Sequence, residues 1–263
     1  MFEGLPAFQV DLLLLGLLAL FAGFVDAIVG GGGLIQLPAL FGFYPAVAPA
    51  QLLGTNKMAA IAGTAVAAGR YLRRVSLPWP ALGPAIAAAL ACSFIGAQTV
   101  AWLPRDMVRP LVLVLLVAVA AHTLVRRDFG AVHAPRRGPV AQRWLGFAAG
   151  AVLGFYDGFF GPGTGAFLMF VFVRVFGWDL LTASAAARVV NVATNLTAFG
   201  FFAATGNVLW LTGTVMAACN IAGSIVGSHL ALTRGTGFVR GVFLAVLALL
   251  IARFGWDTFA AWR

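Results

Sequence analysis

The strongest constraint on this chain is an uncharged run at residues 189–233, which contains no aspartate, glutamate, lysine or arginine. A transmembrane helix needs about 20 consecutive apolar residues, so the run is long enough for two of them. Gly206 and Asn207 form the expected turn between these two helices. A soluble core of ordinary size cannot hide such a run, and the bilayer is the solvent that suits it.

The overall composition agrees with a membrane protein. Of the 263 residues, 62% are hydrophobic and only 10% are charged, whereas soluble domains carry about 25% charged residues. The formal charge of +9 does not indicate a nucleic-acid partner, because the basic residues lie mainly in short segments between apolar runs. We expect the lipid bilayer and a small anionic substrate as partners, and a homo-oligomer is an open alternative.

The apolar runs define an all-α, polytopic membrane helix bundle with about four spans in each half. We expect two membrane repeats, at residues 1–125 and 144–263, joined by a basic cytoplasmic linker at 126–143 that contains five arginines. Two short apolar segments, 34–43 and 166–176, are about half the length of a span and are interpreted as re-entrant half-helices. The expected spans are 12–29, 52–69, 79–102, 107–125, 144–173 (interrupted by glycines), two within 189–233, and 238–254.

The two halves match each other at a constant offset of 131 residues. Asp26 then falls on Asp157, and Lys57 on Arg188. The same offset holds across about 90 positions, which Ala/Leu richness alone does not produce. Internal repeats of this kind are common in secondary transporters. Four spans in each half predict parallel repeats, whereas five predict inverted repeats, and the arginine pattern leaves both open.

Glycine-rich motifs occupy matching places in the two halves, and each follows an aspartate. Consecutive glycines disfavour a helix interior, since each costs about 1 kcal/mol relative to alanine. A broken helix at membrane depth must face protein or a watery cavity, and its free N–H groups favour an anion. Close helix packing is the alternative explanation. The predicted substrate-binding residues in the motifs and in the half-helices that follow are Gly30, Gly31, Gly32, Gly33, Gln36, Gly161, Gly163, Thr164 and Gly165.

Four ionisable residues fall inside expected spans. A charge at the bilayer centre costs at least about 2.5 kcal/mol, so such residues pair with each other or serve a transport pathway. In the functional interpretation, Lys57 and Arg188 attract the anion, while Asp26 and Asp157 respond to protons. In the structural interpretation, the four form two acid–base pairs. Polar neighbours complete the predicted substrate-binding set: Asn56, Asn191 and Asn195. We assign no catalytic residue, metal ligand or cofactor.

The motifs GFVDAIVGGGGLIQLPAL, LLGTNKMAAIAGTAVAAGRYLRR and GFYDGFFGPGTGAFL resemble the TauE/SafE sulfite exporter family, also called the TSUP permeases. The similarity extends through both halves and is greatest to the branch with GGGG in the first half and YDGFFGPGTG in the second. It implies a multi-pass permease of about eight spans in the bacterial inner membrane that exports or imports sulfite, sulfonates or related organic anions. Met169 stands where the repeat aligns Pro38, so the two half-sites need not share one geometry.

We therefore expect a secondary transporter, or permease, for a small anion such as sulfite, a sulfonate or a related organic anion, coupled to protons. No Walker motif is present in the sequence, which argues against ATP drive within this chain. An anion channel is the alternative, although its polar lining would have to be continuous. An intramembrane enzyme is disfavoured because the sequence has neither GxSxG nor HExxH.

Overall fold

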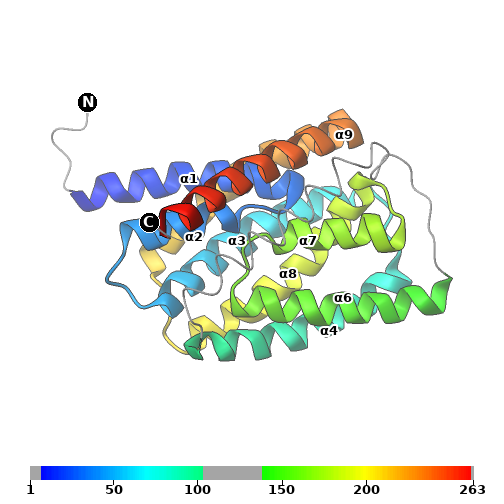
Figure 1. Ribbon diagram of the computed structural model, residues 1–263, viewed down its shortest axis with the longest axis horizontal. Coiled ribbons are helices and arrows are strands. Elements are labelled where there is room, and N and C mark those ends of the chain that lie inside the picture. Colours follow the sequence, from blue (N-terminus) through cyan, green and yellow to red (C-terminus); the bar gives the residue numbers. More distant parts are fainter. Residues whose placement is uncertain (1–6, 103–137, 262–263) are drawn as a thin grey trace.

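The computed structural model describes residues 7–102 and 138–261, and every regular element in that part is helical. The all-α bundle is therefore confirmed, while the expected span at 107–125 and most of the linker lie outside the described residues. The elements are α1 Ala7–Val29, α2 Gly33–Phe43, α3 Pro49–Leu72, α4 Trp79–Gln98, η1 Thr99–Trp102, α6 Pro139–Phe159, α7 Thr164–Val171, the π-helical η2 Phe172–Phe176, α8 Leu180–Ala204 and α9 Trp210–Ala261 (Figure 1).

Several helices begin, end or bend at glycine and aspartate residues. Helix α8 ends at Ala204 and α9 begins at Trp210, so the turn predicted around Gly206 is confirmed. The Asp179 carboxylate begins α8 by accepting hydrogen bonds from the backbone N–H groups of Leu181 and Thr182, each at 2.9 Å. Helix α9 is kinked at Gly235, where φ is 70° and ψ is −163°, so the last expected span lies beyond the kink.

Three helices in the described part are both long enough and apolar enough to cross a membrane: Gln9–Val29, Trp79–Gln98 and Trp210–Val246. Helices α3 and α8 are comparably long, with 24 and 25 residues, but they carry the polar residues that line the inside of the bundle. The outer helices expose large apolar side chains, as a surface in contact with lipid requires. Examples are Leu17, Phe21, Ile95, Val152 and Leu211.

The long helices fall into two groups of opposite direction. Helices α1, α3 and α9 are parallel, because residue numbers rise together along their contacts: Gly16 lies against Cys219 and Gly227 against Phe24, while Gly54 lies against Asn207 and Gly63 against Asn220. Helix α3 runs from an apolar cluster containing Leu53 to a second cluster containing Tyr71. Helices α4 and α8 run from the second cluster to the first, and α6 is parallel to α4.

These directions bear on the repeat that the sequence predicts. In the first half α1 and α3 point one way and α4 the other, whereas in the second half α6 and α8 point the way of α4, and α9 points back. Since α1 and α3 are parallel, the chain at 30–48, including α2, leads back from the end of one to the start of the other. The short helices thus belong to segments that lead back across the bundle, rather than to loops that enter and leave it on one side. The arrangement favours inverted repeats, while the repeat itself stays a prediction.

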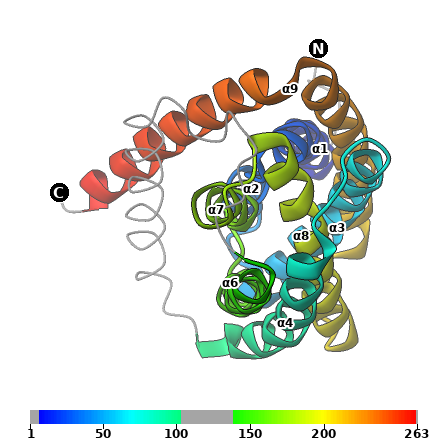
Figure 2. The ribbon, with the colours of Figure 1, turned by 90° about the vertical axis from the view of Figure 1, so that its right-hand side faces the viewer.

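Glycines allow helices from the two halves to pack with their backbones in contact. Gly146, Gly150, Gly154 and Gly158 of α6 pack against the backbone of Ala81, Ala85, Ala89 and Ser93 of α4, with no room for a Cβ atom. Small residues at every fourth position let membrane helices approach this closely. Helix α1 packs against α9 in a similar way, so each close pair joins one helix from each half (Figures 1 and 2).

Several contacts obey the 131-residue offset with the halves exchanged. A Cβ atom at Gly96 would clash with the carbonyl of Phe155, and one at Gly227 would clash with the carbonyl of Phe24. Likewise, Gly23 lies against Asn220, and Gly154 lies against Ala89. These matched contacts support the predicted repeat.

Candidate functional site

Both predicted breaks in the helices are present. Helix α1 ends at Val29 and α2 begins at Gly33, while α6 ends at Phe159 and α7 begins at Thr164. Gly30 has a φ of 79° and Gly161 has a φ of 95°, values that an L-residue with a side chain rarely adopts. We call residues 30–33 the first break and residues 160–163 the second break.

The two breaks contact each other inside the bundle. A Cβ atom added at Gly30 would clash with the backbone of Gly165, and a Cβ atom at Gly165 would clash with Gly30. At Gly33, the position of an added Cβ atom lies 3.5 Å from Pro162 Cα and 3.9 Å from Gly161 O. Figure 2 shows α2 and α7 between α1 on one side and α6 on the other. Residues distant in the sequence therefore build one central polar site.

Side chains from α3 and α8 close the end of α1 at the first break. Arg188 donates from Nε to Ala27 O at 3.1 Å, from a terminal nitrogen to Ser184 O at 2.7 Å, and from the other terminal nitrogen to Asp26 O. Tyr71 Oη donates to Ala27 O at 3.0 Å, and Ser184 Oγ donates to Ile28 O at 2.9 Å. The positive guanidinium also complements the negative end of the α1 dipole.

The Asp26 carboxylate folds back over the same break. Its Oδ1 accepts a hydrogen bond from the backbone N–H of Gly32 at 3.1 Å, and its Oδ2 accepts one from Thr64 Oγ1 at 2.9 Å. Arg188 donates to the backbone carbonyl oxygens of Asp26, Ala27 and Ser184 rather than to the Asp26 carboxylate. The symmetric pairing of acids with bases that the structural interpretation expected is therefore absent at Arg188.

Lys57 and Asp157 form an ion pair between the halves. Lys57 Nζ lies 2.9 Å from Asp157 Oδ2, and both side chains are almost fully buried. The contact is an ion pair by its length, although its angles are not those of a hydrogen bond. Removing one partner of such a pair is strongly destabilising, because a buried charge is left uncompensated. This pair agrees with the structural interpretation and places a cation and a carboxylate beside Gly161.

Several of the backbone N–H groups that were predicted to be free already donate hydrogen bonds within the protein. The Gly32 N–H donates to Asp26, while Ile35 and Gln36 donate from their backbone N–H groups to Gly32 O. In the second break, Thr164 donates to Gly161 O through both its N–H and its hydroxyl group. Among the described residues, the buried N–H groups of Gly31, Gly163, Gly165 and Ala166 make no hydrogen bond, which leaves open donors near both breaks.

Two buried side-chain amides near the breaks also lack partners. Within the described residues, neither Nε2 nor Oε1 of Gln36 makes a hydrogen bond, and the same holds for Oδ1 of Asn56. Asn56 Nδ2 lies 4.0 Å from the position of a Cβ atom added at Gly33. Leaving a polar group buried and unpaired costs about 1–3 kcal/mol. These groups are therefore candidates for contact with a ligand.

The polar residues of α8 bond mainly to their own surroundings. Thr194 Oγ1 donates to Asn191 O at 3.0 Å, and Ser93 Oγ of α4 donates to Thr194 O at 2.9 Å. Asn191 and Asn195 are 7% and 3% exposed, so both face the interior of the bundle. Their predicted role in substrate binding stays a prediction.

Several residues that shape the first break were not predicted from the sequence. Thr64, Tyr71 and Ser184 hold Asp26 and the last carbonyls of α1. A hydroxyl group in an apolar helix is a weak signal, because it bonds equally well to its own helix.

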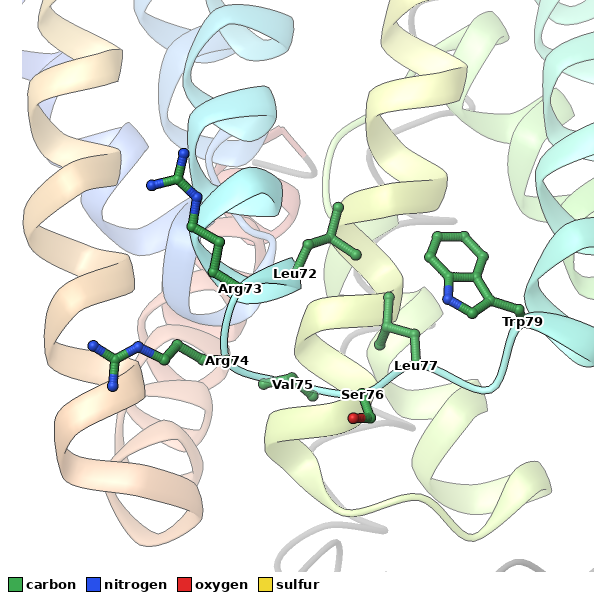
Figure 3. A pocket seen from close by; sticks show the side chains of 7 residues that line it. All are labelled: Leu72, Arg73, Arg74, Val75, Ser76, Leu77 and Trp79. Carbon is green, nitrogen blue, oxygen red and sulfur yellow. The ribbon is translucent and has the colours of Figure 1, made fainter.

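A surface hollow of about 480 Å³ lies away from the breaks, at the loop between α3 and α4 (Figure 3). Arg73, Arg74, Ser76 and Trp79 are among its lining residues, and Figure 3 shows both guanidinium groups directed away from Trp79. None of the predicted site residues lines it. The described residues contain no cluster of three or more histidine, cysteine, aspartate or glutamate side chains suited to a metal ion.

Comparison with known proteins gives one consistent result. A family model described as "Sulfite exporter TauE/SafE" matches residues 15–254. The chain is 36% identical over 258 residues to "Probable membrane transporter protein YfcA" of Escherichia coli K12, covering 95% of this chain and 93% of the relative. It is 34% identical over 235 residues to "Probable membrane transporter protein ORF9" of a Sinorhizobium species, covering 89% and 88%. No solved structure matches.

Proposed function

The chain belongs to the TauE/SafE sulfite exporter family of membrane transporters, and we propose that it is a secondary transporter for a small sulfur oxyanion or organosulfonate, coupled to protons. The family model matches residues 15–254, which supports a role in transport. Under this proposal the protein resides in the bacterial inner membrane, where a proton gradient is available to drive transport.

One observation carries the proposal: two broken helices meet at a buried polar site beside Lys57. An anion in this site would be stabilised by the Lys57 ammonium group, by the open N–H groups of Gly31 and Gly163, and by the buried amide of Gln36. Backbone donors and one cation suit an oxyanion because each oxygen accepts several hydrogen bonds.

Proton coupling follows from competition for Lys57. The Asp157 carboxylate holds the lysine at 2.9 Å, so a substrate anion has to replace an anion that is already bound. When Asp157 gains a proton, its attraction for Lys57 falls and the ammonium group becomes available to the substrate. One proton and one anion would then enter the site together, which avoids an uncompensated charge at membrane depth.

Transport by a carrier is favoured over a channel by the helix directions. Two halves of opposite orientation around a central site are typical of transporters that open alternately to each side. A channel would instead need a polar path along its whole length. The carrier and channel proposals predict different kinetics, so flux measurements separate them.

The test uses purified protein in proteoliposomes. Uptake of labelled sulfite is measured with and without unlabelled sulfite inside, in competition with sulfoacetate, taurine and thiosulfate. We expect saturable uptake that rises with internal substrate and depends on an imposed pH gradient. Flux without saturation or acceleration by internal substrate would indicate a channel, and no flux of any of these anions above empty liposomes would overturn the proposal.

Two variants tie the flux to the central site. Lys57→Gln is expected to abolish uptake, since it removes the buried cation. Arg73→Gln provides a matched control, because it removes a positive charge from an exposed position just after the end of α3. Equal loss in both variants would show that overall positive charge, rather than the central site, controls the flux.

A further inference from the structure

We infer that Gln36 is a specificity-determining residue and that the substrate is a monoanion carrying a hydrogen-bond donor, such as an O–H or N–H group. This inference rests on the proposed transport function and narrows its substrate class. It starts from a side chain whose presence the packing of the fold does not explain. Gln36 is 1% exposed, and in the described part of the chain neither atom of its amide has a partner.

Helix α2 makes this amide conspicuous. Its sequence is GLIQLPALFGF, in which Gln36 carries the sole polar side chain. Leu34, Leu37 and Leu40 of the same helix are buried in apolar clusters. A leucine at position 36 would suit such surroundings without leaving polar atoms unpaired. A buried polar group that weakens the fold is often kept for function.

Gln36 lies one helical turn after the first break. Side chains on a helix lean toward its N-terminus, so Gln36 lies over the turn that begins at Gly32 and Gly33. Pro162 Cα of the second break and Asn56 Nδ2 of α3 lie 3.5 and 4.0 Å from the position of a Cβ atom added at Gly33. The Asn56 carboxamide oxygen is also buried and unpaired within the described residues. Unpaired groups from α2 and α3 thus gather where the two breaks meet.

The unpaired atoms specify both kinds of hydrogen bond. Gln36 Nε2 needs an acceptor, and Gln36 Oε1 needs a donor. This requirement does not depend on which way the amide is turned, since both of its ends are unpaired. A fully deprotonated oxyanion only accepts hydrogen bonds, so it would leave the glutamine oxygen unpaired. Hydrogensulfite or a hydroxysulfonate would satisfy both ends.

The charges of the site favour a single negative charge. Lys57 is opposed by Asp157, and the Asp26 carboxylate lies at the break where Arg188 binds carbonyl oxygens. The two acids and two bases sum to zero. In a medium of low dielectric constant the desolvation energy of an ion rises with the square of its charge, so a dianion is far more costly to bury than a monoanion. A monoanion with a donor group fits both the charge and the hydrogen-bonding pattern.

The test compares two probes of nearly equal shape, 2-hydroxyethanesulfonate and propane-1-sulfonate, which differ by a hydroxyl group in place of a methyl group. Uptake of each is measured in proteoliposomes that contain wild-type protein, Gln36→Leu or Gln98→Leu. Gln98 is an exposed residue at the end of α4 and serves as the matched control. Uptake of hydrogensulfite, whose O–H group is on sulfur, is also measured from pH 5 to pH 8 and compared with uptake of 2-hydroxyethanesulfonate, whose O–H group is on carbon.

We expect wild-type protein and Gln98→Leu to prefer the hydroxysulfonate by about tenfold or more, as sites built to bind a hydroxyl group reject its apolar analogue. Gln36→Leu should lose that preference, because uptake of the hydroxysulfonate falls more than uptake of propane-1-sulfonate. Its melting temperature should equal or exceed that of wild-type protein, because two unpaired buried atoms are removed. A purely structural glutamine would lower both the melting temperature and the uptake of each probe.

Three results would overturn the inference. They are a preference that persists in Gln36→Leu, a wild-type protein that takes up both sulfonates equally, and a melting temperature that falls together with the uptake of both probes. In these cases wild-type uptake of the sulfonates still supports the proposed function. Absence of wild-type uptake of every anion tested would instead reject the transport function itself, together with this inference.

Discussion

The first and second breaks occupy matching places in the two halves, yet they are closed by different chemistry. At the first break, Arg188, Tyr71 and Ser184 donate hydrogen bonds to the last carbonyl oxygens of α1. At the second break, an ion pair joins Lys57 to Asp157 at the end of α6. The positions 131 residues away from Tyr71 and Ser184 are Phe202 and Leu53, and neither of their side chains can donate a hydrogen bond.

The difference separates a fixed element from one that can change. Hydrogen bonds from Arg188 to backbone carbonyl oxygens do not change with protonation, because arginine stays charged. The pair of Lys57 and Asp157 can be opened by protonation of the carboxylate or by a competing anion. We therefore assign the first break mainly to holding the fold and the second mainly to transport.

The largest effect is expected at the first break. Arg188→Met should destabilise the protein by about 3–5 kcal/mol, because it leaves the buried carbonyls of Asp26 and Ala27 without their donor. Arg188→Lys keeps the positive charge and should therefore lose less stability than Arg188→Met. Thermal unfolding in detergent measures both variants. A stable Arg188→Met protein that has lost only transport would contradict the assignment of this residue to the fold.

A smaller loss is expected at the second break, and it should be recoverable. Lys57→Met alone should destabilise the protein by about 3 kcal/mol, since Asp157 is left buried without a counter-charge. Adding Asp157→Leu should restore most of that stability, because apolar replacements of a buried ion pair are often neutral. Uptake should be absent from both the single and the double variant.

The double variant provides the control for folding. If it unfolds at the temperature of the wild-type protein and still transports nothing, the ion pair acts in transport. If it transports at the wild-type rate, the pair is structural and the two breaks do not differ in the way argued above.

Two tyrosines compare the breaks at a single hydroxyl group. Tyr71 donates to Ala27 O at the first break, and Tyr156 donates to Pro162 O at the second, at 2.8 Å. Replacing either with phenylalanine should destabilise the protein by about 1 kcal/mol. Uptake should remain near the wild-type rate in Tyr71→Phe and fall in Tyr156→Phe. Equal uptake by the two variants would remove the functional contrast between the breaks.

The smallest effects are expected where the halves are alike. Ser93 and Ser224 correspond at the repeat offset, and each donates from Oγ to a backbone carbonyl oxygen of the other half: Ser93 to Thr194 O at 2.9 Å, and Ser224 to Gly23 O at 3.3 Å. Ser93→Ala and Ser224→Ala should each destabilise the protein by about 0.5–1.5 kcal/mol and leave uptake unchanged. A strong effect of one alone would show that the asymmetry extends beyond the breaks.

The sequence predicted the elements whose signals are local. The uncharged run at 189–233 predicted two helices and their turn, and the glycines at 30–33 and 161–165 predicted where α1 and α6 end. These features depend on apolar length and on backbone conformation, which neighbouring residues determine. The family resemblance found in the motifs was confirmed by the family model over residues 15–254.

The partners of the charged residues were not predictable, because they depend on the packing of helices from different halves. The sequence left open whether Asp26 and Arg188 pair through their side chains, and the structure places the arginine on backbone carbonyl oxygens. It also did not reveal that Asp26 occupies the N–H group of Gly32. The direction of α2 depends on how α1 and α3 align, which no single segment encodes.

In the proposed coupling, Asp157 gains a proton and releases Lys57, which then binds the substrate anion. Asp157→Asn mimics the protonated residue, and its transport in proteoliposomes tests the claim most directly. The account predicts that exchange of internal for external sulfite continues in this variant, while accumulation driven by a pH gradient is lost. Accumulation driven by the pH gradient at the wild-type level would contradict it.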